Sequence, residues 1–213
     1  NDFIPALTRR GLPATLFYET KANLKRAQIG QLAAAGITTV QPGIESLADS
    51  VLVLMRKGTT VLQNVQTLKW CAELGVTAAW NLLWGFPGED PDAYRAAARI
   101  VPLLTHLDPP IGTGAIRLDR FSPHFAQHEA WGLTRVAAAP SYAFVYPFAP
   151  EVRDRLAYYF TFDYADRDAR DVEGYVAPLL TELRRWRRQH DGSALWMMDA
   201  GDALWIWDLR AAA

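Results

Sequence analysis

The sequence predicts an α/β fold in which strands and helices alternate along the first 125 residues. The first observation is the apolar run Val76–Trp84, which is too short for a helix and reads as a buried strand. The second is its abrupt end at Gly85-Phe86-Pro87-Gly88, followed by Asp90 and Pro91, which favour a helix start. The third is the recurrence of this strand-helix pattern at intervals typical of right-handed βαβ units, which predicts a parallel sheet.

The other elements follow from the same signals. Strands are expected at residues 13–18, 37–41 and 115–121, and helices at residues 1–11, 24–35, 48–57, 61–74 and 92–107. Four strands with their helices amount to half of a (β/α)₈ barrel or the open end of a partial one, so we expect an incomplete barrel. Because such an edge would leave strand groups unpaired, and because the chain opens at Asn1 without Met, we expect further sequence upstream.

A second region, residues 126–213, follows a boundary placed at residue 125. The stretch from Tyr142 to Pro150 is expected to be irregular and extended, with helices at residues 151–160 and 172–188. Residues 194–198 and 203–209 predict a hairpin around Asp199-Ala200-Gly201-Asp202. We therefore expect a small α+β accessory domain here, behind the barrel part at residues 1–125.

Composition excludes several classes of function. The net charge of −1 over 213 residues gives no basis for binding nucleic acid or anionic lipid, and no apolar run reaches the length of a membrane span. One cysteine excludes an intramolecular disulfide framework and is compatible with a cytoplasmic protein. Cys71 lies on the apolar face of its predicted helix, so we expect a buried structural thiol.

Polar side chains follow all four predicted strands. They are Glu19 with Lys21 and Asn23, Glu45 with Ser46, Glu89, and Arg120 with Ser122. Turns and helix caps collect such residues anyway, which is the alternative explanation for each one alone. In a barrel they would converge on one face, around a polar and partly anionic ligand.

Other candidate sites have simpler explanations. His124 and His128 are four residues apart without a third ligand, which favours a helix surface over a zinc site. The arginines at 184–188 are expected on a solvated helix face, with Leu183 and Trp186 buried. Trp196, Trp205 and Trp207 on the hairpin predict a packing surface, with a peptide-binding edge as the alternative.

Three segments together resemble radical S-adenosylmethionine (SAM) enzymes of the cobalamin-binding branch. They are Gln41-Pro42-Gly43-Ile44-Glu45-Ser46, Leu54-Met55-Arg56-Lys57-Gly58, and Asn81-Leu82-Leu83-Trp84-Gly85-Phe86-Pro87-Gly88-Glu89. Four further segments, residues 18–24, 68–71, 120–123 and 157–160, are similar to the radical SAM C-methyltransferases of ribosomal-peptide (bacteriocin-type) maturation.

The resemblance implies a partial (β/α)₆ barrel, of which this chain is the second half. It also implies SAM, a [4Fe–4S] cluster, cobalamin and a precursor peptide as substrate, with C-methylation at an unactivated carbon through a 5′-deoxyadenosyl radical. By position, it implies Glu45 and Ser46 at the ribose or methionyl end of SAM. It further implies Leu83, Gly85, Pro87, Gly88 and Glu89 beside the adenine, Arg120 and Ser122 on the sixth-strand side, and Glu19 and Lys21 on the third.

The chain departs from the family in lacking the Cys-x3-Cys-x2-Cys loop that binds the cluster. We therefore expect this chain alone to be inactive, and an upstream cobalamin-binding domain and cluster-binding half-barrel to complete it. The alternatives are a non-catalytic barrel domain that binds a peptide or partner, or a different radical SAM chemistry such as epimerisation, thioether formation or ring formation.

Overall fold

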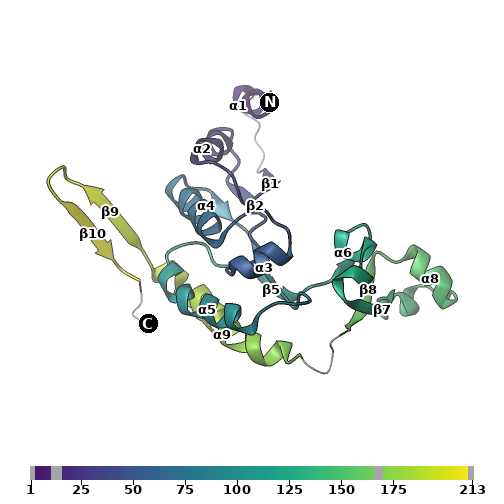
Figure 1. Ribbon diagram of the computed structural model, residues 1–213. Helices are drawn as coiled ribbons and strands as arrows, with labels where there is room; N and C mark the ends of the chain where they lie inside the picture. Colours follow the sequence, from purple (N-terminus) through teal and green to yellow (C-terminus); the bar gives the residue numbers. More distant parts are fainter. Residues whose placement is uncertain (1–2, 11–15, 166–169, 211–213) are drawn as a thin grey trace. The chain divides into compact units, whose positions relative to one another are not determined.

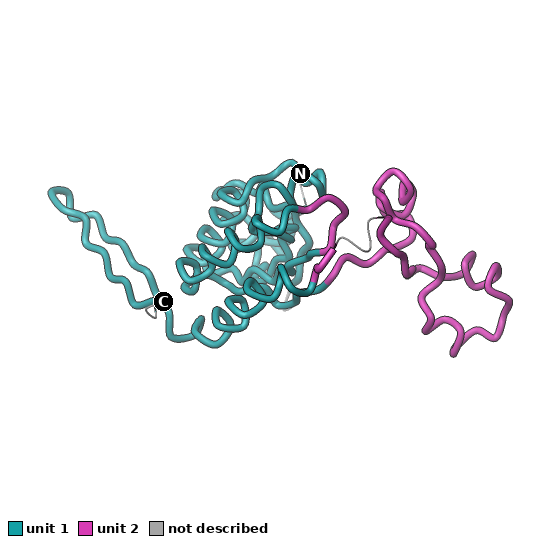
Figure 2. The backbone as a smooth tube through the Cα atoms, turned by 60° about the horizontal axis from the view of Figure 1, so that its bottom comes forward, with its two compact units in different colours: residues 1–84, 90–114, 173–213 teal, residues 85–89, 115–172 magenta. Residues whose placement is uncertain are grey.

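The computed structural model describes residues 3–10, 16–165 and 170–210, which form two compact units. Unit 1 comprises residues 1–84, 90–114 and 173–213, and unit 2 comprises residues 85–89 and 115–172 (Figure 2). The predicted boundary at residue 125 thus falls inside unit 2, and the chain returns to unit 1 at residue 173.

Unit 1 contains the predicted parallel sheet. Strands β1 (Phe17–Thr20), β2 (Thr39–Pro42) and β3 (Thr77–Ala78) pair in that order, with Tyr18 opposite Val40 and Val40 opposite Ala78. A separate pair joins β4 (Asn81–Trp84) to β5 (Gly112–Ala115). The alternation of strand and helix that the sequence predicts is confirmed, with β1 beginning later than residue 13 and residues 11–15 outside the described part.

The single strand predicted at residues 76–84 is divided into β3 and β4. The interruption lies at Ala79 and Trp80, where the fully buried indole of Trp80 donates a 2.9 Å hydrogen bond to the carbonyl oxygen of Asp108. The ring of Trp80 also packs against Trp186, with centroids 6.0 Å apart. Burial of this large side chain between the two strands accounts for a break that an apolar run does not reveal.

The helices of unit 1 match their predicted positions closely. They are α1 (Phe3–Arg10), α2 (Arg26–Ala34), α3 (Asp49–Leu54), α4 (Val61–Glu73), α5 (Pro91–Ile100), the 3₁₀ turn η1 (Val101–Leu104) and α9 (Val172–Gln189). Thr60 caps α4 in a capping box with Gln63, and Asp90 caps α5 before Pro91. Figure 1 shows α2 beside α4 and α5 beside α9. The ring centroids of Tyr94 in α5 and Tyr175 in α9 are 5.4 Å apart.

The core of unit 1 lies between the sheet and these helices. Its fully buried side chains include Ile29, Val40, Leu68, Trp80 and Trp186. Cys71 is also fully buried, which confirms the predicted structural thiol. Leu183 and Trp186 occupy the buried side of α9 while Arg184 and Arg188 are exposed, as predicted.

Unit 2 contains an antiparallel sheet that the sequence analysis missed. Its strands are β6 (Leu118–Asp119), β8 (Tyr159–Tyr164) and β7 (Leu133–Ala138) in that order. The short helices α6 (Pro123–Ala126), α7 (Ser141–Val145) and α8 (Pro150–Leu156) and the 3₁₀ turn η2 (Glu129–Trp131) accompany it. Leu118, Leu133, Ala157 and Phe160 form its buried centre.

Three expectations for this region are wrong. The strand expected at residues 115–121 is divided between β5, which begins at Gly112, and β6, which pairs antiparallel with β8. The helix expected at residues 151–160 ends at Leu156, because Tyr159 and Phe160 pair with β6. The stretch expected to be irregular contains α7.

The predicted hairpin is confirmed as β9 (Leu195–Asp199) and β10 (Leu204–Asp208), preceded by the 3₁₀ turn η4 (His190–Gly192). Leu204 lies opposite Asp199, and Trp207 lies opposite Trp196. Every residue of both strands is exposed, so the predicted packing surface is open to solvent and the peptide-binding edge stays a prediction. Among the described residues, no helix is long and apolar enough to cross a membrane.

Candidate functional site

The turn that follows β2 carries Glu45, the most unusual backbone position of the predicted site residues. Glu45 has φ 54°, in the left-handed region that residues other than glycine rarely occupy. Its carbonyl oxygen accepts a 2.9 Å hydrogen bond from the amide of Leu83, and Glu45 forms a parallel bridge with Leu82. Such a conformation costs about 1–3 kcal/mol and persists only where neighbouring contacts impose it, which makes the turn a candidate site.

The carboxylate of Glu45 is accessible and paired with one cation. Lys57 Nζ lies 2.7 Å from Glu45 Oε2, and the two side chains are 28% and 30% exposed. A side chain added at Gly43 would lie 3.5 Å from the same ammonium group. The turn therefore presents a carboxylate and an ammonium group, which can bind hydroxyl, amino or carboxylate groups of a polar ligand.

Ser46 is buried and has a local role. Its hydroxyl accepts a 3.1 Å hydrogen bond from the amide of Ala48, just before α3. This bond shapes the chain between the turn and α3. The contact between Ser46 and a cofactor stays a prediction.

Asn64 of α4 is a residue that the sequence analysis did not single out. Its amide nitrogen Nδ2 donates hydrogen bonds to the carbonyl oxygens of Ile44 at 3.2 Å and Ser46 at 3.1 Å, and the side chain is fully buried. The signal that could have revealed it is a polar residue four positions before Leu68, on the apolar face of the predicted helix.

The end of β1 lies beside this turn. Glu19 pairs in register with Gln41, and the amide of Gly43 donates a 3.0 Å hydrogen bond to the carbonyl oxygen of Thr20. Glu19 and Lys21 are both exposed. Unit 1 thus brings two of the four predicted strand ends together, and it places Leu83 directly against the backbone of Glu45.

The turn from Gly85 to Glu89 belongs to unit 2 and is organised by the carboxylate of Glu89. Oε1 accepts a 2.8 Å hydrogen bond from the amide of Gly85, and Oε2 accepts a 2.9 Å bond from the amide of Phe86. The side chain of Glu89 is 0% exposed. The predicted ligand-binding carboxylate therefore holds its own turn in shape, and Pro87 and Gly88 lie at the more accessible tip.

Arg170 and Tyr164, which come from the last part of the unit 2 sequence, also bind this turn. Arg170 Nη2 donates a 3.0 Å hydrogen bond to the carbonyl oxygen of Phe86 and lies 3.4 Å from Glu89 Oε1. The Arg170 guanidinium also lies 4.2 Å from the centre of the Tyr164 ring. A buried carboxylate held by two amides and a guanidinium is a fully partnered group, which makes the turn rigid.

Arg120 and Ser122 serve the local structure of unit 2. Arg120 Nε donates a 2.5 Å hydrogen bond to the carbonyl oxygen of Ala157, and its guanidinium also binds the carbonyl oxygen of Asp154. The Ser122 hydroxyl accepts a 3.1 Å hydrogen bond from the amide of Phe125, at the start of α6. Both side chains thus bind the protein's own backbone, and their contact with a cofactor stays a prediction.

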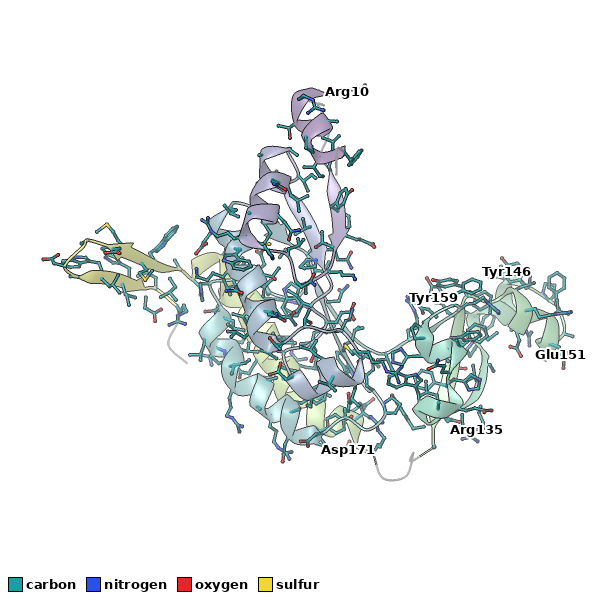
Figure 3. All side chains as sticks on the ribbon, turned by 45° about the horizontal axis from the view of Figure 1, so that its top comes forward. Arg10, Arg135, Tyr146, Glu151, Tyr159 and Asp171 are labelled. Carbon is teal, nitrogen blue, oxygen red and sulfur yellow. The ribbon has the colours of Figure 1, made fainter. Side chains whose placement is uncertain are left out.

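Charged and aromatic groups elsewhere in unit 2 are similarly engaged. Figure 3 shows Arg135, Tyr146 and Tyr159 among the side chains of this unit. Arg135 pairs with Asp163 at 2.5 Å, Tyr146 stacks with Tyr142 and Phe148, and the Arg117 guanidinium lies 4.0 Å from the Tyr159 ring.

The residues of this chain do not fit an iron–sulfur cluster. Burial raises the pKa of Cys71 to about 12, so the single thiol stays protonated, whereas cluster ligands are thiolates. The described part of the chain contains no group of three or more His, Cys, Asp or Glu side chains that could hold a metal ion. His124 lies in α6 with its ring against Trp131 and Phe86, at centroid distances of 4.4 and 5.7 Å.

The family comparison matches the part of the chain that carries the Glu45 turn. Residues 7–101 match the Radical SAM superfamily. This segment includes Glu19, Lys21, Glu45, Ser46 and the whole Gly85–Glu89 turn. Comparison with the curated proteins gives no match.

Solved structures share the fold at low sequence identity. The radical SAM methyltransferase TsrM from Kitasatospora setae, with tryptophan substrate and a SAM analogue bound, is 19% identical with a TM-score of 0.55. The match covers 85% of this chain and 40% of that one. The cobalamin-dependent SAM radical enzyme OxsB, with aqua-cobalamin bound, is 12% identical with a TM-score of 0.57 over 90% of this chain and 31% of that one. The chain therefore spans less than half the length of either structure.

Proposed function

We propose that this chain supplies the SAM-binding second half of the barrel in a longer radical SAM enzyme. The observation that carries the proposal is the Glu45 turn, which lies inside the segment that matches the Radical SAM superfamily. There a strained backbone at φ 54° presents a carboxylate beside Lys57. A carboxylate accepts hydrogen bonds from the hydroxyl groups of a ribose, and an ammonium group pairs with a carboxylate such as that of a methionyl group.

The chain's own residues bind and orient SAM in this proposal. The Glu45 carboxylate accepts hydrogen bonds from the polar end of the cofactor. Ser46, Glu19 and Lys21 lie nearby on the same sheet edge. The Gly85–Glu89 turn with Leu83 remains a predicted contact for the adenine, and Arg120 with Ser122 a predicted contact on the sixth-strand side. A cluster bound by cysteines outside this chain would supply the reducing chemistry, and cobalamin would supply methyl-transfer chemistry.

We further propose that the whole enzyme C-methylates a ribosomally made precursor peptide at an unactivated carbon. This finer assignment rests on the resemblance of residues 18–24, 68–71, 120–123 and 157–160 to the peptide-maturation methyltransferases. TsrM, one of the structures that share the fold, is a radical SAM methyltransferase, which is in keeping with this assignment. Other radical chemistry on a peptide, such as epimerisation or thioether formation, is the competing assignment.

The test uses the full-length protein with its cluster reconstituted under anaerobic conditions. SAM, a reductant and methylcobalamin are supplied, and 5′-deoxyadenosine is measured by chromatography. The proposal predicts its formation in the wild type and a loss of at least about tenfold in Glu45→Ala, a factor equivalent to about 1.4 kcal/mol. Cluster content equal to wild type in Glu45→Ala is the control, and equal 5′-deoxyadenosine formation in both proteins would contradict the proposal.

The substrate class is tested by adding the precursor peptide encoded beside the enzyme's gene. A net gain of one CH2 unit, from a methyl group that replaces a hydrogen on a carbon, supports C-methylation. An unchanged mass with inverted stereochemistry, or a loss of two hydrogens, would instead assign epimerisation or ring and thioether formation.

A further inference from the structure

The backbone on both sides of Glu45 is held by one side chain, Asn64. The carbonyl oxygens of Ile44 and Ser46 accept its two hydrogen bonds, at 3.2 and 3.1 Å. Both partners are acceptors, so the side-chain amide must turn its nitrogen towards them, and the orientation of Asn64 is fixed by the contacts themselves.

The burial of Asn64 carries a desolvation cost. The side chain is fully buried, and its oxygen Oδ1 has no hydrogen-bond partner among the described residues. An apolar side chain of the same size would leave no such unsatisfied acceptor in the core. What Asn64 provides in exchange is a pair of donors aimed at the two carbonyl groups that flank Glu45.

The conformation of Glu45 requires this kind of restraint. At φ 54° its backbone lies in the left-handed region, which an unrestrained glutamate leaves readily. The amide of Leu83 binds the carbonyl oxygen of Glu45 itself, while Asn64 binds the carbonyls before and after it. The carbonyl oxygen of Ile44 also accepts a 2.7 Å hydrogen bond from the amide of Ser46, so the turn closes on itself while Asn64 and Leu83 hold its three carbonyl groups from α4 and β4.

We propose that Asn64 is a positioning residue that fixes the Glu45 turn and thereby aims the Glu45 carboxylate at the cofactor. The proposal rests on the function proposed above, because it assigns to Asn64 the orientation of a SAM-binding group. Asn64 itself does not touch the cofactor, since it is fully buried behind the turn.

The first test is hydrogen exchange in the full-length protein without SAM. Asn64→Leu keeps the branched shape and the number of heavy atoms of the side chain and removes both donors. Cys71→Ala is the matched control, because Cys71 is fully buried on the same helix and the change leaves the Glu45 turn untouched. We expect amide exchange over residues 43–48 and at Leu83 to be faster by about tenfold or more in Asn64→Leu, which is the factor for a loss of about 1.4 kcal/mol. Exchange there should equal wild type in Cys71→Ala, and unchanged exchange in Asn64→Leu would overturn the inference whatever the cofactor does.

The second test is SAM affinity, measured by calorimetry on the same proteins and on Glu45→Gln. We expect Asn64→Leu to weaken binding by about tenfold, as Glu45→Gln does, and Cys71→Ala to bind like wild type. If Glu45→Gln weakens binding while Asn64→Leu does not, the positioning role is wrong and the proposed function stands. If wild type itself binds no SAM, the proposed function fails, and the positioning role fails with it.

A third variant separates positioning from general loss of packing. In Asn64→Asp the carboxyl group donates to a carbonyl only when it is protonated, and burial favours that neutral form. Because a neutral carboxyl group has one O–H, it can replace only one of the two donated bonds. SAM affinity of Asn64→Asp should therefore recover in part as the pH falls from about 8 towards about 6, while Asn64→Leu stays weak at every pH. An Asn64→Asp protein whose affinity has the same pH dependence as Asn64→Leu would contradict a role for the donated hydrogen bonds.

Discussion

The hydroxyl group of Tyr164 donates a 2.5 Å hydrogen bond to the carbonyl oxygen of Gly85, which lies 79 residues earlier in the chain. The contact explains why a glycine stands at position 85. A Cβ atom there would lie 2.8 Å from the tyrosine oxygen, and the backbone has φ +88°. Residue 85 is thus restricted both by its conformation and by its neighbour.

Gly85→Ala is expected to lower the free energy of unfolding more than Gly88→Ala does. Gly88 has φ +76°, and no atom lies within 4 Å of the point that a Cβ would occupy, so its alanine variant carries only the backbone strain. We expect a loss of about 1 kcal/mol for Gly88→Ala and about 2–3 kcal/mol for Gly85→Ala. Urea denaturation measures both losses in the free energy of unfolding. When the two glycine variants are made in a Tyr164→Phe background, the difference between their losses should be smaller. Equal losses would show that the Tyr164 contact does not restrict residue 85.

Glu89→Gln is expected to lower the free energy of unfolding by about 1–3 kcal/mol, because one of the two amides of Gly85 and Phe86 loses its acceptor. Asp90→Asn is the control, since asparagine caps a helix as well as aspartate and Asp90 is exposed. Urea denaturation of both variants measures the two changes in the free energy of unfolding. A Glu89→Gln protein as stable as Asp90→Asn would contradict the assigned role of the carboxylate.

Trp186→Phe is expected to destabilise unit 1 by about 1–3 kcal/mol, because the indole donates a 2.8 Å hydrogen bond to the carbonyl oxygen of Leu107 in a fully buried position. Trp205→Phe on the hairpin, where the tryptophan is 55% exposed, should cost less than about 0.5 kcal/mol. Thermal or urea unfolding followed by circular dichroism separates the two. The reverse order of stability would show that the hairpin, and not the Trp186 site, carries the packing.

Cys71 is expected to resist thiol reagents in the folded protein. Burial raises its pKa from 9.0 to about 12, so the native thiol stays neutral while the unfolded thiol ionises at lower pH. The contribution of Cys71 to stability is complete below about pH 9 and is lost as the pH rises towards about 12, because only the unfolded state then releases the proton. Alkylation by iodoacetamide at about pH 8 should require unfolding. Rapid reaction of Cys71 in the native state would contradict its burial.

Local signals in the sequence predicted a large part of the fold. Asp90 with Pro91 marked the start of α5, and the turn residues around Gly201 indicated the hairpin, although not its register. The strand β8 was mistaken for the end of a helix, because a short apolar run such as Tyr158–Phe160 suits either structure. Its partner strand β6 lies about 40 residues away, and such non-local pairing leaves no local pattern.

The residues of the candidate site could also be predicted only in part. Glu45, Gly85 and Glu89 were found because strand ends and glycine turns are visible in sequence. Asn64, Tyr164 and Arg170 were missed, since their contacts with those turns span 20, 79 and 84 residues. The structure also shows that Glu89, predicted to face a ligand, binds the amides of its own turn, which only three-dimensional contacts can reveal.

Calorimetric titration of the full-length protein with SAM, comparing Glu45→Gln with Glu73→Gln, decides whether the Glu45 turn binds the cofactor. The two carboxylates are matched, since each pairs with a lysine and their side chains are 30% and 36% exposed. We expect Glu45→Gln to weaken SAM binding by about tenfold or more, equivalent to about 1.4 kcal/mol, while Glu73→Gln binds like wild type. Equal affinity of wild type and Glu45→Gln would contradict the assignment of this turn to the cofactor.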